Sequence, residues 1–294
     1  MNLCFIVNPN AGKKKGVFLA ENAVELLKER GHTTELRVSS GPGDTRTLAA
    51  DLDTGPFDGV VAVGGDGTLF EVINGLLTGR NEIPVPVGQI PVGTGNSFIK
   101  DLGIDTLDDA VEKISGGAVR DIDLGHFTCG DGEYFFINLL GAGFVSNVAY
   151  RAKKYKWLGS LSYILGVLEE LVALKPCRCE LTIDGVLYER DLIFVEICNS
   201  RLTGGNMIMS PGAKIDDGLL DIMVLNPVRR GKLLKLFPKI YDGSHIDDED
   251  VEVFTGKEIK LETAFPLALT PDGETFGTTP IDVEMSAIKV PMFG

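Results

Sequence analysis

The chain has 294 residues, enough for one large domain or two. Hydrophobic residues make up 44% and charged residues 24%, which is typical of a folded globular protein and excludes a disordered chain. The formal net charge is −14, which argues against a nucleic-acid partner because phosphate contacts need clustered positive charge. The five cysteines, an odd number in a long chain, do not form a pattern typical of a disulfide framework.

The first 124 residues alternate short apolar runs with amphipathic segments. The runs at residues 3–7, 59–63 and 85–92 predict buried strands, with helices between them. This order predicts a doubly wound α/β domain over residues 1–124 with parallel strands. Each of the three strands ends in a turn that contains glycine. Because ligands bind at the carboxyl ends of strands in such sheets, we expect these turns to lie together on a binding edge.

Strand-like segments dominate from about residue 120. Asp184-Gly185 between two of them is a strong hairpin signal. Two helical segments interrupt the strands, near residues 159–174 and 231–241. The pattern predicts a second, β-rich antiparallel domain over residues 125–294, whose extreme C-terminus could pack back on the first domain.

The turn Gly64-Gly65-Asp66-Gly67-Thr68 carries residue types suited to phosphate. Its glycines let the backbone approach closely, and amides at the start of the following helix point at phosphate oxygens. A carboxylate there needs a divalent cation between it and the phosphate. Residues 8–16 and 91–96 form two further loops of this kind. Each loop, taken alone, also fits a plain turn at a helix start.

Together these three segments resemble the diacylglycerol kinase catalytic-domain family, which includes bacterial lipid kinases and sphingosine and ceramide kinases. Similar blocks in the second half are Gly141-Ala142-Gly143-Phe144, Asn199 with Gly204-Gly205, Pro211 with residues 213–219, and Asp272-Gly273-Glu274. The resemblance covers essentially the whole chain. The Gly-Gly-Asp-Gly-Thr turn alone is shared with NAD kinases and phosphofructokinases, so the combination carries the specificity.

The resemblance implies a kinase that uses ATP and Mg2+ to phosphorylate a lipid hydroxyl. It also implies an N-terminal domain like that of NAD kinase and phosphofructokinase, followed by an antiparallel β-sandwich. The nucleotide contacts that it implies are Asn8, Gly64, Gly65, Asp66, Gly67, Thr68, Thr94, Gly95 and Asn96.

Further roles are also implied by the resemblance. Asp66 and Asp123 would join an aspartate–water–magnesium network, and Asp66 also counts as a catalytic residue. Asp217 would hold a structural cation with the carbonyls of Lys214 and Leu219. Glu274 would orient or deprotonate the acceptor hydroxyl, a role that physics supports because a positioned carboxylate can accept the proton.

Three readings stay open. The first is a lipid kinase with a diacylglycerol-like or sphingoid-like acceptor. The second is a kinase of a soluble hydroxyl substrate such as NAD. The third is a nucleotide- or lipid-binding regulatory protein that has lost catalysis, which is motivated by Ser97, where many bacterial members of the family carry Asp. The presence of Asp66, Asp123 and Glu274 argues against this last reading.

We expect a cytoplasmic protein that contacts the membrane surface peripherally. Residues 1–10 lack a signal-peptide pattern, and acidic residues interrupt the apolar stretch at 158–174. Residues 151–158 and 229–237 mix basic and apolar side chains as interfacial segments do, although each also fits a helix packed on a core. The resemblance further allows a homodimer.

Overall fold

The computed structural model describes residues 1–93, 95–152, 154–155 and 161–294. For residues 161–163 it describes the backbone only. The chain folds into two units. The first consists of Met1–Leu124 with Ala287–Gly294, and the second of Gly125–Ser286. Among the described residues, no helix combines the length and apolar character needed to cross a bilayer.

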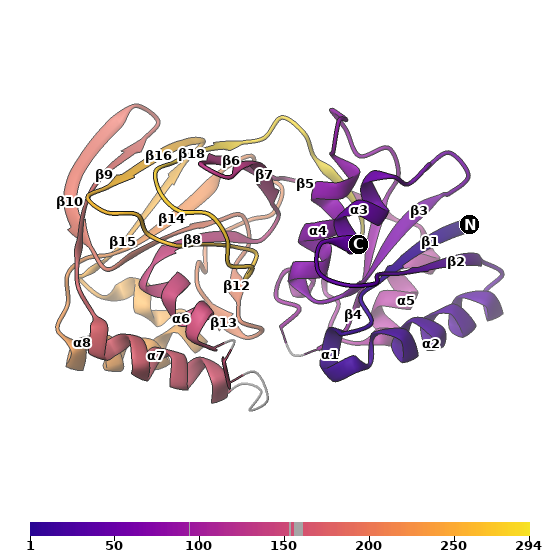
Figure 1. Cartoon of the computed structure of the whole chain (residues 1–294), viewed down its shortest axis with the longest axis horizontal. Helices are drawn as coiled ribbons and strands as arrows, with labels where there is room; N and C mark the ends of the chain where they lie inside the picture. The colour runs from indigo at the N-terminus through magenta and orange to yellow at the C-terminus, as the bar shows by residue number, and fades with distance from the viewer. Residues whose placement is uncertain (94, 153, 156–160) are drawn as a thin grey trace. The chain divides into compact units, whose positions relative to one another are not determined.

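The first unit is built on a six-stranded sheet with the strand order β2-β1-β3-β4-β19-β5 (Figure 1). Strands β1 to β4 pair in parallel, as the alternation of strand and helix predicts. All residues of β3 are buried, which is why its sequence is a continuous apolar run. The strands are β1 (Asn2–Val7), β2 (Thr33–Val38), β3 (Gly59–Gly64), β4 (Val87–Pro91), β5 (Val119–Ile122) and β19 (Val290–Phe293).

Helices cover both faces of this sheet. Helix α2 packs beside α5, and α3 packs beside α4 (Figure 1). A capping box fixes the start of α5, where the Thr106 hydroxyl accepts from the Asp109 amide at 3.2 Å. The helices are α1 (Ala11–Lys14), α2 (Gly16–Glu29), α3 (Asp44–Ala50), α4 (Asp66–Leu76), the 3-10 helix η1 (Phe98–Leu102) and α5 (Leu107–Gly116).

The last strand of the chain belongs to the first unit. β19 lies between β4 and β5, parallel to β4 and antiparallel to β5. Its side chains Val290 and Met292 are fully buried. The second unit therefore ends at Ser286 and not at the end of the chain.

The second unit is an antiparallel β-sandwich. Its six-stranded sheet has the order β10-β9-β16-β18-β6-β7, and its five-stranded sheet has the order β15-β14-β11-β8-β17. The strands are β6 (Gly125–Cys129), β7 (Gly132–Phe136), β8 (Leu139–Gly143), β9 (Cys177–Ile183), β10 (Val186–Leu192), β11 (Phe194–Cys198), β14 (Leu220–Leu225), β15 (Val251–Gly256), β16 (Glu258–Thr263), β17 (Leu269–Pro271) and β18 (Ile281–Met285).

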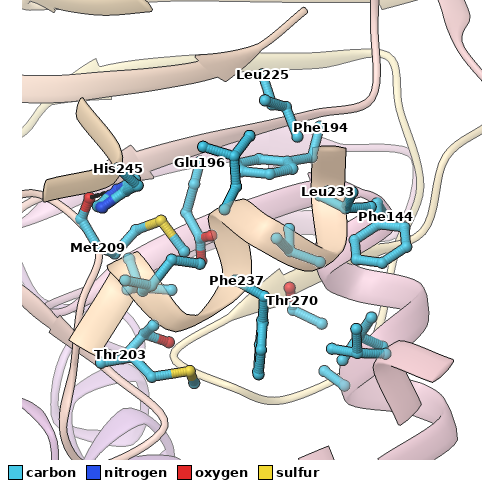
Figure 2. A pocket seen from close by; sticks show the side chains of 18 of the residues that line it. Phe144, Phe194, Glu196, Thr203, Met209, Leu225, Leu233, Phe237, His245 and Thr270 are labelled. Carbon is cyan, nitrogen blue, oxygen red and sulfur yellow. Dashed lines mark hydrogen bonds between the residues drawn. The ribbon is translucent and has the colours of Figure 1, made fainter. Parts of the chain in front are cut away.

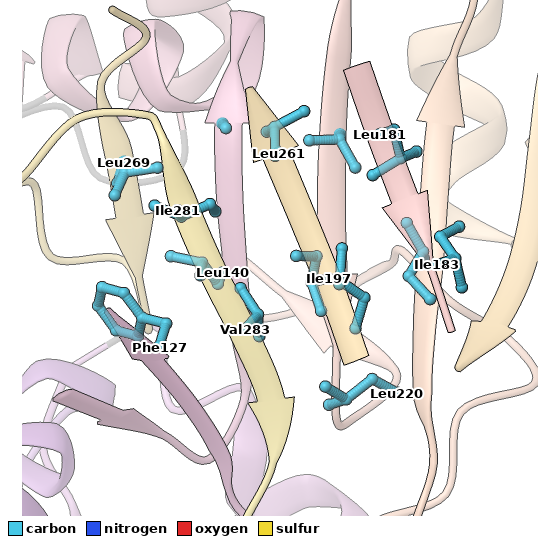
Figure 3. Close-up of a cluster of buried hydrophobic side chains, with 14 of the residues drawn as sticks. Phe127, Leu140, Leu181, Ile183, Ile197, Leu220, Leu261, Leu269, Ile281 and Val283 are labelled. Carbon is cyan, nitrogen blue, oxygen red and sulfur yellow. The ribbon is translucent and has the colours of Figure 1, made fainter. Parts of the chain in front are cut away.

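The core of the sandwich consists of branched and aromatic side chains from both sheets (Figure 3). Strand β9 shows why: alternate residues, among them Cys179, Leu181 and Ile183, are buried, and those between them are exposed or half-buried. The predicted Asp184-Gly185 hairpin joins β9 to β10. A short pair, β12 (Leu202–Thr203) and β13 (Met207–Ile208), stands apart from the two sheets.

A second apolar cluster lies on the outer face of the five-stranded sheet, where helices cover it. The predicted segment 231–241 forms two elements and not one. The break comes at Pro238, which has no backbone N–H to continue an α-helix. The helices are α6 (Phe144–Ala152), α7 (Leu161–Ala173), α8 (Arg230–Leu236) and the 3-10 helices η3 (Phe237–Tyr241) and η4 (Ser244–Asp247).

Candidate active site

The three predicted turns of the first unit lie together at the carboxyl edge of its sheet. Asn8 follows β1, and its side-chain Nδ2 donates to the Thr68 hydroxyl after β3 at 3.3 Å. Gly12 has a φ of +55°, and a Cβ added there would lie 2.7 Å from the Val92 side chain. The turns after β1, β3 and β4 are therefore in contact, as the strand order predicts.

The turn after β3 depends on glycine. A Cβ added at Gly64 would lie 2.1 Å from the Thr68 hydroxyl oxygen, so no other residue fits there without displacing Thr68. Gly65 is the N-cap of α4 and has extended backbone, with φ −92° and ψ −168°. A glycine N-cap offers no side chain to the amides of the first helical turn. These amides are suited to an anion.

The Asp66 carboxylate joins this turn to the one after β4. Its Oδ2 accepts from the Ser97 amide at 2.9 Å, and its Oδ1 faces the Phe98 amide at 3.4 Å. Burial raises the pKa of Asp66, while the hydrogen bonds from these amides lower it. A carboxylate in such surroundings gains from a nearby cation, because the cation favours its charged form.

Asn96 places a carboxamide at the same turn. Its φ of +45° lies in the left-handed region that asparagine tolerates, and its Nδ2 donates to the Gly93 carbonyl at 3.2 Å. Its Oδ1 is buried and has no hydrogen-bond partner in the part of the chain that the structure describes. An orphaned amide oxygen fits a ligand hydroxyl or a hard cation.

Two further predicted nucleotide contacts belong to this region. A Cβ added at Gly95 would lie 3.6 Å from the Asp66 Oδ2, which places Gly95 beside that carboxylate. Gly67 lies in the first turn of α4. Thr94 lies outside the described residues.

Asp123 forms an ion pair with a lysine of the same unit. Its side chain is 1% exposed, and its Oδ1 lies 2.8 Å from the Lys289 ammonium. Lys289 directly precedes β19 and belongs to no motif, so sequence reasoning gave no reason to single it out. Over the described residues, no group of three or more His, Cys, Asp or Glu side chains is arranged to hold a metal ion.

The predicted residue Glu274 lies on a turn after β17 that is anchored by its neighbour. Asp272 is 3% exposed and has a φ of +46°. Its carboxylate accepts from three backbone amides, those of Ile137, Asn138 and Leu139, at 3.1, 2.9 and 3.0 Å. The Glu274 amide donates to the Pro271 carbonyl at 2.8 Å, and Glu274 itself is exposed. Asp272 thus holds the turn on which the exposed Glu274 lies.

The predicted cation residue Asp217 lies on an exposed turn before β14. Its carboxylate accepts from the Leu219 amide at 3.1 Å, and Lys214 is exposed nearby in sequence. Burial raises the pKa of Asp221, and the negative charge of Asp217 raises it further. The two carboxylates therefore lie close enough to repel each other.

The second unit encloses a cavity that sequence reasoning did not find (Figure 2). It holds about 850 Å³ of empty space, the open mouth included, and hydrophobic side chains form most of its wall. Its lining comes from segments far apart in the chain, such as Phe144 of α6, Phe194 of β11 and Phe237 of η3. Gly273 also lines it, one residue before Glu274.

Comparisons with known proteins agree with this architecture. The family described as "Diacylglycerol kinase catalytic domain" matches residues 2–127. The one described as "YegS C-terminal NAD kinase beta sandwich-like domain" matches residues 138–292.

Individual relatives match over nearly the full chain. The chain is 32% identical to a diacylglycerol kinase of Mycobacterium tuberculosis, covering 96% of this chain and 91% of that protein. It is 26% identical to sphingosine kinase 2 of Arabidopsis thaliana, and the match covers 97% of this chain and 69% of that protein. A crystal structure described as a diacylglycerol kinase of Bacillus anthracis str. Sterne has the same fold, with a TM-score of 0.73 and 23% sequence identity. The match covers 99% of this chain and 96% of that chain. The chain belongs to the diacylglycerol kinase family of phosphotransferases with alcohol acceptors.

Proposed function

We propose that the protein transfers the γ-phosphate of ATP to a hydroxyl of a diacylglycerol-like or sphingoid-like lipid, with Mg2+ as cofactor. The observation that carries this proposal is the apolar cavity of the second unit, whose wall includes Gly273 beside the exposed carboxylate of Glu274. The apolar lining of this cavity suits a hydrocarbon chain. A soluble nucleotide such as NAD has no such chain to bury.

The nucleotide contacts are proposed at the carboxyl edge of the first sheet. The amides at the start of α4 would accept phosphate, beside Asn8, Thr68 and Asn96. The carboxylate of Asp66 and the orphaned amide oxygen of Asn96 are oxygen donors of the type that Mg2+ prefers. Bound there, Mg2+ would neutralise the phosphate charge that develops during transfer. Asp123 would join this network through water.

Glu274 would then act on the acceptor. The hydroxyl oxygen of the lipid attacks the γ-phosphorus, ADP leaves with the electrons of the broken P–O bond, and the hydroxyl proton passes to the Glu274 carboxylate. A positioned general base typically speeds such a step by about a hundredfold or more. The turn that Asp272 anchors keeps the carboxylate in place while the lipid binds.

A structural cation is proposed at the turn before β14. Asp217 would hold it with the carbonyl oxygens of Lys214 and Leu219. The mutual repulsion of Asp217 and Asp221 supports this role, because a cation at Asp217 would relieve it.

The lipid would be taken from a membrane surface. The segment of α8 and η3 contributes the apolar side chains of Leu233 and Leu236 to the cavity. Its outer side carries exposed basic residues and, among them, the exposed hydrophobic residues Leu234 and Tyr241, which are 43% and 48% exposed. The exposed basic residues of this segment, counted from the N-cap of α8, are Arg229, Arg230, Lys235 and Lys239. We propose a peripheral association with anionic lipid in the cytoplasm, through this face.

The test is transfer of labelled γ-phosphate from ATP and Mg2+ to lipids in detergent micelles. The panel contains diacylglycerol, monoacylglycerol, sphingosine, ceramide, phosphatidylglycerol and undecaprenol, with NAD as a soluble acceptor. We expect one lipid class to be labelled, and Glu274→Gln to lower its turnover at least ~10²-fold while ATP binding is kept. Labelling of NAD alone, or ATP binding without transfer to any acceptor, would contradict the proposal.

A further inference from the structure

Glu196 is an acidic residue in the wall of the apolar cavity. It lies in the middle of β11, an inner strand of the five-stranded sheet, and is 3% exposed. Its alternate neighbour Phe194 lines the same cavity, whereas Val195 and Ile197 face the sandwich core. Figure 2 shows the Glu196 side chain among the cavity residues. The alternation of β11 calls for a hydrophobic residue here, so the carboxyl group needs an explanation.

One oxygen of the buried Glu196 carboxyl group is left without a hydrogen bond in the part of the chain that the structure describes. This oxygen, Oε2, is enclosed and makes no hydrogen bond to any residue in the described ranges. A buried polar atom without a partner is costly, and such atoms in native folds often mark a place where a ligand binds. Burial also raises the pKa of Glu196 to about 8. At neutral pH the group is therefore mostly a neutral acid, which carries one hydrogen to donate.

A second polar group lies beside it. A Cβ added at Gly141 would lie 3.3 Å from the Glu196 Oε1 and 2.9 Å from the Thr270 hydroxyl oxygen, so both flank Gly141. The Thr270 hydroxyl is already hydrogen-bonded to the Ser146 hydroxyl at 3.0 Å. Among the described residues, two buried polar atoms of the cavity lining lack a hydrogen-bond partner, Glu196 Oε2 and His245 Nδ1. The Glu196 carboxyl group lies beside Gly141 and Thr270 and has hydrogen-bonding capacity left for a ligand.

The position of this group relative to Glu274 suggests what the ligand is. Thr270 and Gly273 both line the cavity and are three residues apart, so at most about 10 Å of chain separates them. In an acylated glycerol or an acylated sphingoid base, a carbonyl oxygen lies a few bonds from the free primary hydroxyl. A lipid whose hydroxyl is at Glu274 and whose chains enter the cavity would therefore carry its acyl carbonyl toward this part of the wall.

We propose that the cavity binds a lipid with an acyl carbonyl near its hydroxyl, and that Glu196 selects it by donating a hydrogen bond to that carbonyl oxygen. The carbonyl can belong to an ester, as in diacylglycerol, or to an amide, as in ceramide. A free sphingoid base and an ether-linked glycerol lack it. The inference rests on the proposed function for the lipid class, and it assigns Glu196 as a specificity residue that takes no part in phosphate transfer.

The experiment compares two ligands that differ only in the carbonyl. Dioctanoylglycerol and its dioctyl ether analogue are titrated into the protein by calorimetry without ATP, and their phosphorylation is then measured with ATP and Mg2+. A buried hydrogen bond to a partner that is otherwise unsatisfied predicts about tenfold tighter binding of the ester. In Glu196→Met the two affinities should become equal. In Glu196→Gln, whose amide still donates, most of the preference should return.

Met209→Leu is the matched control, because Met209 lines the same cavity without a hydrogen-bonding role for the ligand. It should change both affinities by the same factor and keep their ratio. N-octanoyl sphingosine tests the amide arm and should behave like the ester. An ester-to-ether ratio that is the same in the wild type, Glu196→Met and Glu196→Gln would overturn the inference.

The binding and transfer readouts separate this inference from the proposed function. Ester-selective binding that depends on Glu196, without phosphorylation of either lipid, would support the inference and contradict the proposed function. Phosphorylation of both lipids with equal efficiency and equal binding would support the proposed function and overturn the inference. Glu196→Met could fail to fold. In that case the inference is overturned if the wild type binds the ester and the ether equally well and Glu196→Gln has the same ratio of ester to ether affinity.

Discussion

Asp272 and Glu274 are acidic residues of one turn that differ in their surroundings, and we propose a catalytic role for the second alone. The Asp272 carboxylate is buried and satisfied by three amides, so its charge is fully used by the fold. Glu274 is exposed on the same turn. The sequence predicts Glu274 from the motif, but it does not distinguish the two roles, because burial of Asp272 depends on residues 137–139, far away in the chain.

The burial of Glu196 predicts how the free energy of unfolding changes with pH. Burial raises its pKa from an ordinary 4.5 to about 8. Between these values the unfolded chain releases a proton that the folded chain keeps, so the free energy of unfolding falls as pH rises. The fall is up to about 1.4 kcal/mol per pH unit, and it stops above about pH 8, where both states are ionised. Glu196→Gln removes this contribution.

The measurement is the free energy of unfolding in urea for both proteins at pH 5, 6.5 and 8. The wild type should lose stability relative to Glu196→Gln over this range. His245 of η4, which lines the same cavity, is present in both proteins, so its titration contributes equally to both curves. Parallel curves for the two proteins would show that Glu196 does not change its protonation on folding.

Asp217 gives a metal-dependent prediction. If this carboxylate holds a cation in the folded state only, binding adds to stability by mass action. Asp217→Ala should therefore lower the melting temperature more in millimolar Mg2+ than in a chelator. Asp216→Ala, at the neighbouring exposed position, is the control. Equal decreases in Mg2+ and in chelator would leave Asp217 with only its hydrogen bond to the Leu219 amide.

At the scale of elements, the sequence predicts those strands, helices and hairpins that local periodicity and turn residues determine. The parallel strands β1, β3 and β4 and the hairpin at Asp184-Gly185 are confirmed. The segment at residues 159–174 is confirmed as α7 (Leu161–Ala173). The cavity could not be predicted, because its wall combines α6, β11, α8 and η3, and no local pattern records which distant faces meet.

The α8–η3 segment allows a prediction for the membrane surface. Its exposed basic side chains should attract anionic lipid by about 1 kcal/mol each near the surface. Lys235→Glu together with Lys239→Glu should therefore weaken cosedimentation with vesicles of phosphatidylglycerol and phosphatidylcholine by at least tenfold at low salt. Lys28→Glu with Lys113→Glu, on helices of the first unit, matches the charge change and should have a much smaller effect. Equal losses in both double variants would indicate only a net-charge effect.

At the scale of the whole molecule, the chain leaves the first unit at Leu124 and returns to it at Ala287. The strand that returns, β19, is flanked on both sides in the sheet, so the first unit cannot complete its sheet from residues 1–124 alone. The sequence allows the C-terminus to pack on the first domain, but its place between β4 and β5 is a long-range pairing that local pattern does not encode. Folding of the first unit therefore depends on the last residues of the chain.

Lys289, in the C-terminal segment that returns to the first unit, forms a long-range ion pair with Asp123. Its ammonium lies 2.8 Å from the buried Asp123 carboxylate, so removing the ammonium takes away an ion pair of a buried charge. Because Lys289 itself is partly exposed, we expect a moderate loss, about 1–3 kcal/mol of unfolding free energy for Lys289→Met, and a much smaller one for Lys289→Arg. Urea unfolding measures both.

The same variant tests the proposed magnesium network. If Asp123 also acts on Mg2+ through water, ATP with Mg2+ should recover part of the stability that Lys289→Met loses, because a bound cation would again offset the negative charge of Asp123. ATP with a chelator should not. Full stability of Lys289→Met in the absence of ligand would show that the fold does not depend on the Lys289–Asp123 ion pair. Equal recovery with and without Mg2+ would show that Asp123 does not act on the metal.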